Sequence, residues 1–193
     1  MMNGFERRTE QKKQHILSCA HQMFKAQGVK EVNIMDLAKV ADVSHVTIYH
    51  YFGNKKGLIE ASLDDTLERK SQEANDIMMQ EGSFESRLEK LVRYEINRYE
   101  GYHEDFVERL IQREKALLKR DPETIFEGTK SLILQGRQEG RIQTDLSDET
   151  LVMLVHMFRF LKSNGYLQNA QVVKEIFDLF RRGLGGRIVE NQH

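Results

Sequence analysis

Residues 33–58 read NIMDLAKVADVSHVTIYHYFGNKKGL, and their apolar positions repeat at helical spacing on both sides of a short break. Asn33 can cap a first short helix, because its side-chain oxygen can accept from the free N–H groups of the first turn. The helical pattern stops at residues 42–44, and Ser44 can cap a second helix over residues 45–51. The stretch therefore predicts two short helices joined by a three-residue turn, with a third helix starting directly behind them.

The outer surface of the second short helix carries hydroxyl, imidazole and phenol groups but no carboxylate. Such donors suit phosphate oxygens and base edges, whereas carboxylates would repel phosphate. Because a helix-turn-helix places its second helix in the DNA major groove, the pattern predicts a DNA-binding surface. We expect the start of this helix to contact base edges and the residues around it to contact phosphates. The expected base contacts are His45, Val46 and Thr47, and the expected phosphate contacts are Asn33, Ser44, Tyr49, His50 and Lys55.

This part of the chain resembles the DNA-binding domain of the tetracycline-repressor (TetR) family of bacterial transcriptional regulators. Residues 9–27 fit the family's first helix, so the resemblance covers roughly the first third of the chain. Asp42 stands where the family usually has glycine, and Val46 stands where a small residue or proline is common. Aspartate tolerates a left-handed backbone better than most residues, so the turn can still form. The matching elements are Leu37-Ala38, Ala41-Asp42-Val43-Ser44, Thr47-Ile48-Tyr49-His50-Tyr51-Phe52 and Asn54-Lys55 with Leu58.

The resemblance implies an all-α fold, with a three-helix DNA-binding domain in residues 1–58 and a helical ligand-binding and dimerisation domain in residues 59–193. It further implies a repressor that a small-molecule effector releases from a palindromic operator. The helix from Ile59 would pass ligand occupancy on to the recognition helices. Aromatic residues beyond the first domain are candidates for the ligand pocket, although each is also compatible with an ordinary core position. They are Tyr94, Tyr99, Tyr102, Phe106, Phe126 and Phe158.

Two apolar stretches near the C-terminus, residues 150–163 and 172–184, bear on assembly. Apolar residues occupy most of the circumference of each predicted helix, so each helix needs cover on two sides. We expect one side to pack on the domain core and the other on a second copy, giving a homodimer. The alternative is that both helices are internal to one chain. A dimer is favoured because a lone helix-turn-helix reads too few bases.

Composition agrees with a helical intracellular chain. Its 193 residues include a single proline and a single cysteine and carry a net charge of −1. The chain has no 18-residue apolar run and its N-terminus is polar, so we expect a cytoplasmic protein without a membrane partner. The first 60 residues hold nine Lys/Arg and six Asp/Glu, and the remainder holds more acids than bases. Four of the basic residues, Arg7, Arg8, Lys12 and Lys13, either contact DNA or belong to a solvated tail.

Residue motifs with the spacing typical of catalytic sites are absent from the sequence. It contains no His-Glu-x-x-His pair, no Cys-x-x-Cys pair, no Gly-x-Ser-x-Gly elbow and no glycine-rich phosphate loop. We therefore expect no enzyme activity, no metal and no cofactor, and Cys19 is better explained as a buried, inert thiol. Two alternatives stay open. One is a helical interaction or ligand-binding protein that does not use DNA, and the other is an enzyme on a helical scaffold.

Overall fold

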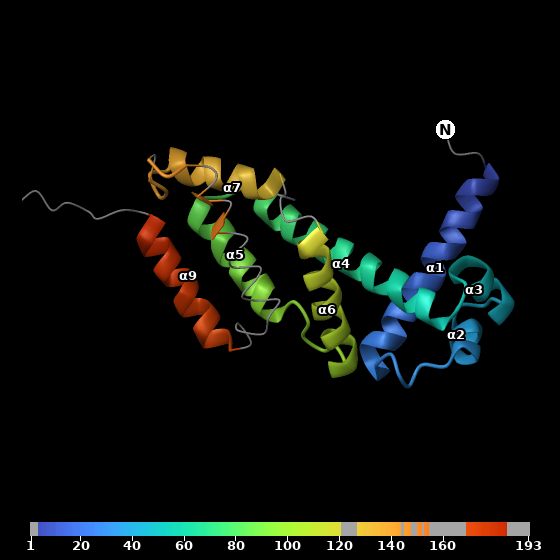
Figure 1. The fold of residues 1–193 in the computed structure, drawn as a ribbon. Coiled ribbons are helices and arrows are strands. Elements are labelled where there is room, and N and C mark those ends of the chain that lie inside the picture. The colour runs from blue at the N-terminus through green and yellow to red at the C-terminus, as the bar shows by residue number, and fades with distance from the viewer. Residues whose placement is uncertain are drawn as a thin grey trace, which may run out of the picture. The chain divides into compact units, whose positions relative to one another are not determined.

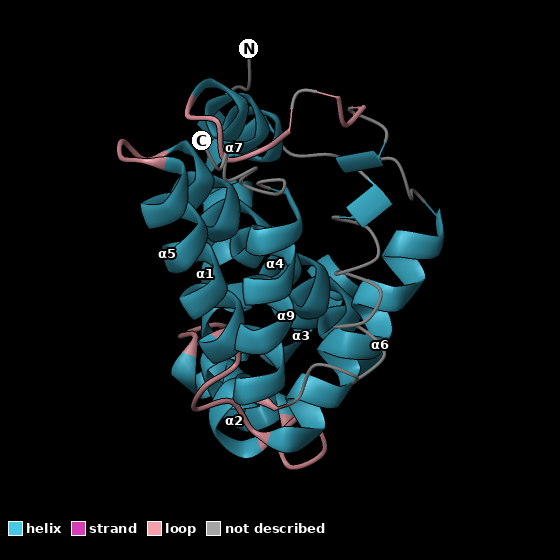
Figure 2. Ribbon diagram, turned by 90° about the vertical axis from the view of Figure 1, so that its left-hand side faces the viewer, coloured by secondary structure: helices cyan, strands magenta, loops and turns pink. Residues whose placement is uncertain are grey.

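The computed structural model describes residues 4–120, 127–143, 145–147, 150–151, 153–154 and 169–184. Within these residues the chain forms eight bounded α-helices and no strand, which confirms the predicted all-α fold. Loops and turns join the first six helices in chain order (Figure 2). In chain order the helices are α1 (Gly4–Gln27), α2 (Ile34–Val40), α3 (His45–Phe52), α4 (Lys55–Met79), α5 (Phe84–Asn97), α6 (Glu104–Arg120), α7 (Glu127–Gln138) and α9 (Ala170–Leu184) (Figure 1).

The chain divides into two compact units. The first unit comprises Met1–Arg69 and Tyr99–Glu114, and the second comprises Lys70–Arg98 and Lys115–His193. Helices α4 and α6 each contribute residues to both units. The domain boundary predicted after Leu58 falls inside the first segment of the first unit. As a division between a DNA-binding and a ligand-binding part, it stays a prediction.

The core of the first unit takes one apolar face from each of its helices. On α1 this face recurs at helical spacing, and α2 packs between α1 and α3. At about 25 cal/mol per Å² of apolar area removed from water, each large side chain in this core stabilises the fold by about 1.5–3 kcal/mol. The most deeply buried apolar residues are Ile16, Phe24, Val29, Val32, Leu37, Ile48, Leu58, Phe106 and Leu110.

The turn between α2 and α3 has the conformation that the sequence predicts. Asn33 Oδ1 accepts a hydrogen bond from Met35 N at 2.8 Å, so the predicted cap of α2 is confirmed. At the other end of α2, Asp42 adopts a left-handed backbone with φ 50°. The N–H groups of Asp42 and Val43 bond back to carbonyls of α2, which closes the helix in the manner of a Schellman motif. Aspartate thus occupies the position where such motifs usually have glycine.

The junction between α3 and α4 is equally tight. Asn54 Oδ1 accepts from Gly57 N at 2.9 Å and caps α4. A Cβ atom added to Gly57 would lie only 2.1 Å from the carbonyl oxygen of Phe52, the last residue of α3. Only glycine allows this approach, so the first turn of α4 supports the end of α3.

Helix α1 begins at Gly4, earlier than the predicted start at Thr9. No proline or glycine interrupts residues 5–27, and Glu6 in the first turn interacts favourably with the positive end of the helix. The predicted helix was therefore too short, because the prediction followed the apolar positions and the first turns of α1 carry mostly exposed polar side chains.

The second unit has its own core, formed by Met78, Phe84, Leu132, Ile142 and Leu151. Helix α5 packs on α7 and α9. The side chain of Glu139 accepts from Phe84 N at 3.0 Å and so caps α5 from a distance of 55 residues along the chain.

Much of the predicted dimer helix 150–163 lies outside the described residues, whereas residues 172–184 fall within α9. Among the described helices, none combines the length and the apolar character that a membrane span requires.

Candidate nucleic-acid interface

Helix α3 fully buries one side chain, exposes His45, Val46, Tyr49 and His50, and leaves Thr47, Tyr51 and Phe52 half-buried. Ile48 has no exposed surface and anchors the helix in the core of the first unit. Val46 is 62% exposed and Tyr49 is 41% exposed, so large side chains point away from the protein. The exposed side of α3 therefore presents both an apolar side chain and a phenol to a binding partner.

The start of α3 is held by a local hydrogen-bond pair. Ser44 Oγ accepts from Thr47 N at 3.1 Å, so Ser44 caps the helix as predicted. The two hydroxyl groups of Ser44 and Thr47 lie 2.9 Å apart and share one hydrogen bond. Two hydroxyls that share one bond keep one proton free, and that proton remains available to an external acceptor.

Aromatic contacts along α3 order the exposed side chains. The rings of His45 and Tyr49, one turn apart, meet edge to face with centroids 6.2 Å apart. His50 contacts Tyr51 with centroids 5.4 Å apart. These contacts limit the rotamers of the side chains that the sequence assigns to DNA, which lowers the entropy lost on binding.

The expected phosphate contacts outside α3 also keep donors available. The cap uses only Oδ1 of Asn33, so the side-chain NH₂ group is not engaged by the cap and can donate to a phosphate. Lys55, at the start of α4, donates from Nζ to the carbonyl oxygen of Lys30 at 3.3 Å. A lysine ammonium has three hydrogens, so two stay available for a phosphate.

Acids near this surface are few and partly paired. On α2, the carboxylate of Asp36 lies 2.8 Å from Lys39 Nζ. Asp42 in the turn is exposed, but α3 has no acid in its first turn. The positive end of α3 is therefore left without a carboxylate of its own helix, which suits a negatively charged ligand.

The residues expected to line a ligand pocket do not lie in one unit. In the first unit, the rings of Tyr102 and Phe106 stack at 6.0 Å, and both meet His21 edge to face. Tyr99 contacts Tyr102 in the same unit. Tyr94 belongs to the second unit, where its hydroxyl donates to the carbonyl oxygen of Lys70 at 2.8 Å. Phe126 and Phe158 lie outside the described residues.

The second unit contains a groove that the sequence reasoning missed. Described residues of α5 and α9 line about 470 Å³ of space, and none of the predicted aromatic residues is among them. The available signal was the spacing of four between Leu88, Val92 and Ile96, which gives α5 one apolar stripe. Lys174 and Asp178 on α9 add charge to the wall.

Possible metal ligands and the single cysteine bear on chemistry other than binding. In the described part of the chain, the His, Cys, Asp and Glu residues form no group of three that could hold a metal ion. Cys19 is half-buried, with Sγ 3.9 Å from His15 Nε2, and burial raises the pKa of its thiol. A raised pKa favours the protonated thiol, which is the less reactive form, although the side chain is less buried than the sequence predicts.

Comparison with known proteins supports the helix-turn-helix. Residues 16–62 match the family described as bacterial regulatory proteins, tetR family. A curated relative, the HTH-type transcriptional regulator HbdR of Aromatoleum sp. (strain CIB), is 34% identical over 64 residues, which is 33% of this chain. The match spans 28% of that relative's length.

Solved structures extend the likeness of fold along most of the chain. A TetR-family transcriptional regulator from Pectobacterium atrosepticum superposes with a TM-score of 0.64 at 18% identity, covering 92% of this chain and 96% of the other. A putative TetR-family regulator from Mesorhizobium loti MAFF303099 gives a TM-score of 0.60 at 17% identity, with the same coverage of 92% and 96%. At such identities these structures bear on the fold alone.

Proposed function

Because residues 16–62 match the family described as bacterial regulatory proteins, tetR family, we propose that the chain is a sequence-specific DNA-binding transcriptional regulator. It represses transcription by binding a palindromic operator, and a small-molecule ligand releases it from that operator. The observation that carries the proposal is the exposed, capped helix α3, which buries only Ile48. It acts in the cytoplasm, where the operator lies.

The roles on DNA follow the exposed chemistry of this surface. His45, Val46 and Thr47 contact base edges, and Val46 suits a thymine methyl group because its side chain is apolar and exposed. Phosphate oxygens accept from donors around α3, which fixes the helix on the duplex without adding sequence preference. These donors are Asn33, Ser44, Tyr49, His50 and Lys55.

Operator binding by this fold requires a homodimer, which we place at residues 150–163 and 172–184. Support comes from α9, where Leu179 is 68% exposed and Val172 is 37% exposed. Exposed apolar residues on a helix of the second unit are consistent with cover from a second copy. Two-fold symmetry then sets two α3 helices against half-sites that lie about one helical turn, or roughly 34 Å, apart.

The ligand binds in the second unit, and helix α4, unbroken from Lys55 to Met79, carries its effect toward α3. The groove along α5 is a candidate wall for this ligand, and Tyr94 is the described aromatic residue named from the sequence that lies in the same unit. The energetic requirement is small. A ligand that prefers the DNA-incompetent conformation by about 3 kcal/mol lowers operator affinity more than a hundredfold.

A titration of labelled genomic fragments, followed by fluorescence anisotropy at several salt concentrations, tests the proposal. We expect binding whose affinity falls steeply with salt, because Lys and Arg contacts release counterions from DNA. Absent or salt-independent binding would favour a helical ligand-binding protein that does not use DNA. A matched variant, Val46→Glu, adds a carboxylate at an exposed position of α3 and should weaken binding without unfolding the protein.

A further inference from the structure

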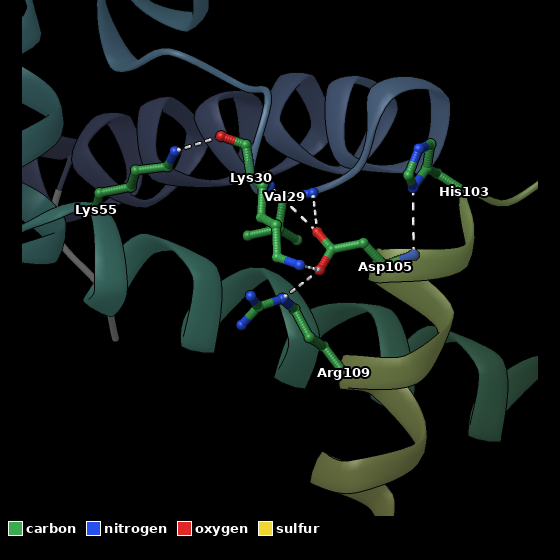
Figure 3. Close-up of polar contacts among 6 residues, drawn as sticks. All are labelled: Val29, Lys30, Lys55, His103, Asp105 and Arg109. Carbon is green, nitrogen blue, oxygen red and sulfur yellow. Dashed lines mark hydrogen bonds and ion pairs between the residues drawn. The ribbon is translucent and has the colours of Figure 1, made fainter.

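Asp105, at the start of α6, connects that helix to the turn between α1 and α2 (Figure 3). Its Oδ2 atom accepts from Val29 N at 2.8 Å and from Lys30 N at 3.1 Å. Its Oδ1 atom accepts from Arg109 Nε at 3.2 Å. The Asp105 side chain is only 13% exposed. One largely buried carboxylate thus satisfies two backbone donors that lie 76 and 75 residues earlier in the chain.

The backbone around this turn is shaped for the contact. Gly28 ends α1 in a left-handed conformation with φ 80°, and a Cβ atom there would lie 2.6 Å from His103 Nδ1. His103 N donates to the carbonyl oxygen of Lys25 at 2.7 Å, and Asp105 N donates to His103 Nδ1 at 3.2 Å. The start of α6 is therefore held against the end of α1 by bonds that run in both directions.

The turn between α1 and α2 also holds Lys55, a residue of the proposed DNA-binding surface. The peptide group of Lys30 donates its N–H to Asp105, and the carbonyl of the same residue accepts from Lys55 Nζ at 3.3 Å. Figure 3 shows the three groups in sequence, with Lys30 between the carboxylate and the ammonium. A shift of the turn moves the acceptor that Lys55 uses.

We propose that Asp105 is a positioning residue for DNA binding, which fixes the α1–α2 turn so that the carbonyl of Lys30 holds the Lys55 ammonium ready for a phosphate. The inference rests on the proposed function and extends it to α6, which lies outside the matched residues 16–62. Lysine has a long, flexible stem, so an anchor that leaves two donors available reduces the entropy lost when a phosphate binds.

The charge of Asp105 allows a positioning role to be distinguished from a purely electrostatic effect on DNA binding. Burial raises the pKa of this carboxyl, but bonds from Val29 N, Lys30 N and Arg109 outweigh burial, and the net pKa is lowered. The group is therefore ionised at neutral pH. Removing a negative charge from a DNA-binding unit should by itself strengthen DNA binding. Loss of positioning should weaken it, so the two effects have opposite signs.

The test is a double-mutant cycle on salt-dependent binding to a random duplex, with Asp105→Asn, Lys55→Ala and the double variant. Glu104→Gln is the matched control, because Glu104 is exposed, lies one residue away and carries the same charge. One lost phosphate contact lowers the slope of log K against log salt by about 0.9, which is about fivefold in affinity at 0.15 M salt. We expect Asp105→Asn to weaken binding by up to that factor.

We further expect the double variant to bind no more weakly than Lys55→Ala alone, and Glu104→Gln to bind as tightly as the wild type or more tightly. Losses that multiply in the double variant, or an Asp105→Asn variant that binds like the control, would overturn the inference. If Asp105→Asn proves unfolded by circular dichroism, Asp105→Glu replaces it in the same cycle, because it keeps the charge but displaces the carboxylate from Val29 N and Lys30 N, and the criterion stays the same. A wild type without salt-dependent binding would instead refute the proposed function.

Discussion

The substitution Gly57→Ala tests whether α3 is supported as the structure describes. Gly57 lies in the first turn of α4, and glycine costs a helix about 1 kcal/mol relative to alanine. Helix propensity alone therefore predicts a more stable variant. The structure predicts the opposite, because the new Cβ atom would lie 2.1 Å from Phe52 O.

The magnitude follows from what must move. A main-chain oxygen at the end of α3 cannot turn aside as a flexible side chain can, so α3 and α4 have to separate. Overpacking of this kind costs about 1–3 kcal/mol, and steric contact this close favours the upper part of that range. After subtraction of the helix gain, we expect a net loss of about 1–2 kcal/mol. DNA affinity should fall as well, because α3 changes its position.

Urea denaturation followed by circular dichroism gives the free energy of unfolding, and anisotropy gives the DNA affinity. Gly4→Ala is the control, since Gly4 belongs to α1 and a Cβ atom there has no described atom within 4 Å. The control should be neutral or stabilised by up to about 1 kcal/mol. A Gly57→Ala variant as stable as this control, with unchanged DNA binding, would refute the packing argument at the junction.

Three further predictions concern DNA directly. Lys55→Ala should weaken binding to operator and random DNA alike and lower the salt slope by about one, and a variant that lost only sequence discrimination would contradict this role. Thr47→Ala should change the preferred bases in a selection from random duplexes, and an unchanged preference would reject a base contact. Arg7 and Arg8 are exposed on the first turns of α1. If they contact phosphates, replacing both with glutamine should lower the salt slope by up to about two, whereas an unchanged slope would assign them to solvent.

Local features of the fold could be read from the sequence because their causes are local. Capping by Asn33 and Ser44 depends on residues two or three positions away, and both caps are present. The left-handed backbone of Asp42 follows from the need to end α2 and from the tolerance of aspartate for that conformation. The same reasoning predicted that Ile48 faces the core and that His45, Tyr49 and His50 face outward, and it missed that Thr47 is half-buried.

Contacts between distant residues could not be read in this way. No residue near Val29 in the sequence indicates that its N–H will bond to Asp105, because that pairing depends on how α6 packs in the first unit. The groove along α5 depends in the same way on the approach of α9. Aromatic residues were chosen for the ligand pocket by type, and the structure divides the described ones between two units because residue type does not determine packing partners.

Sequencing of duplexes selected by the wild-type protein from a random pool tests the central claim most directly. If two α3 helices read DNA as a symmetric pair, the selected duplexes should share an inverted repeat with half-site centres about one helical turn, roughly 34 Å, or a multiple of it apart. A pool that stays random after selection, or one enriched in a single unrepeated site, would contradict the account.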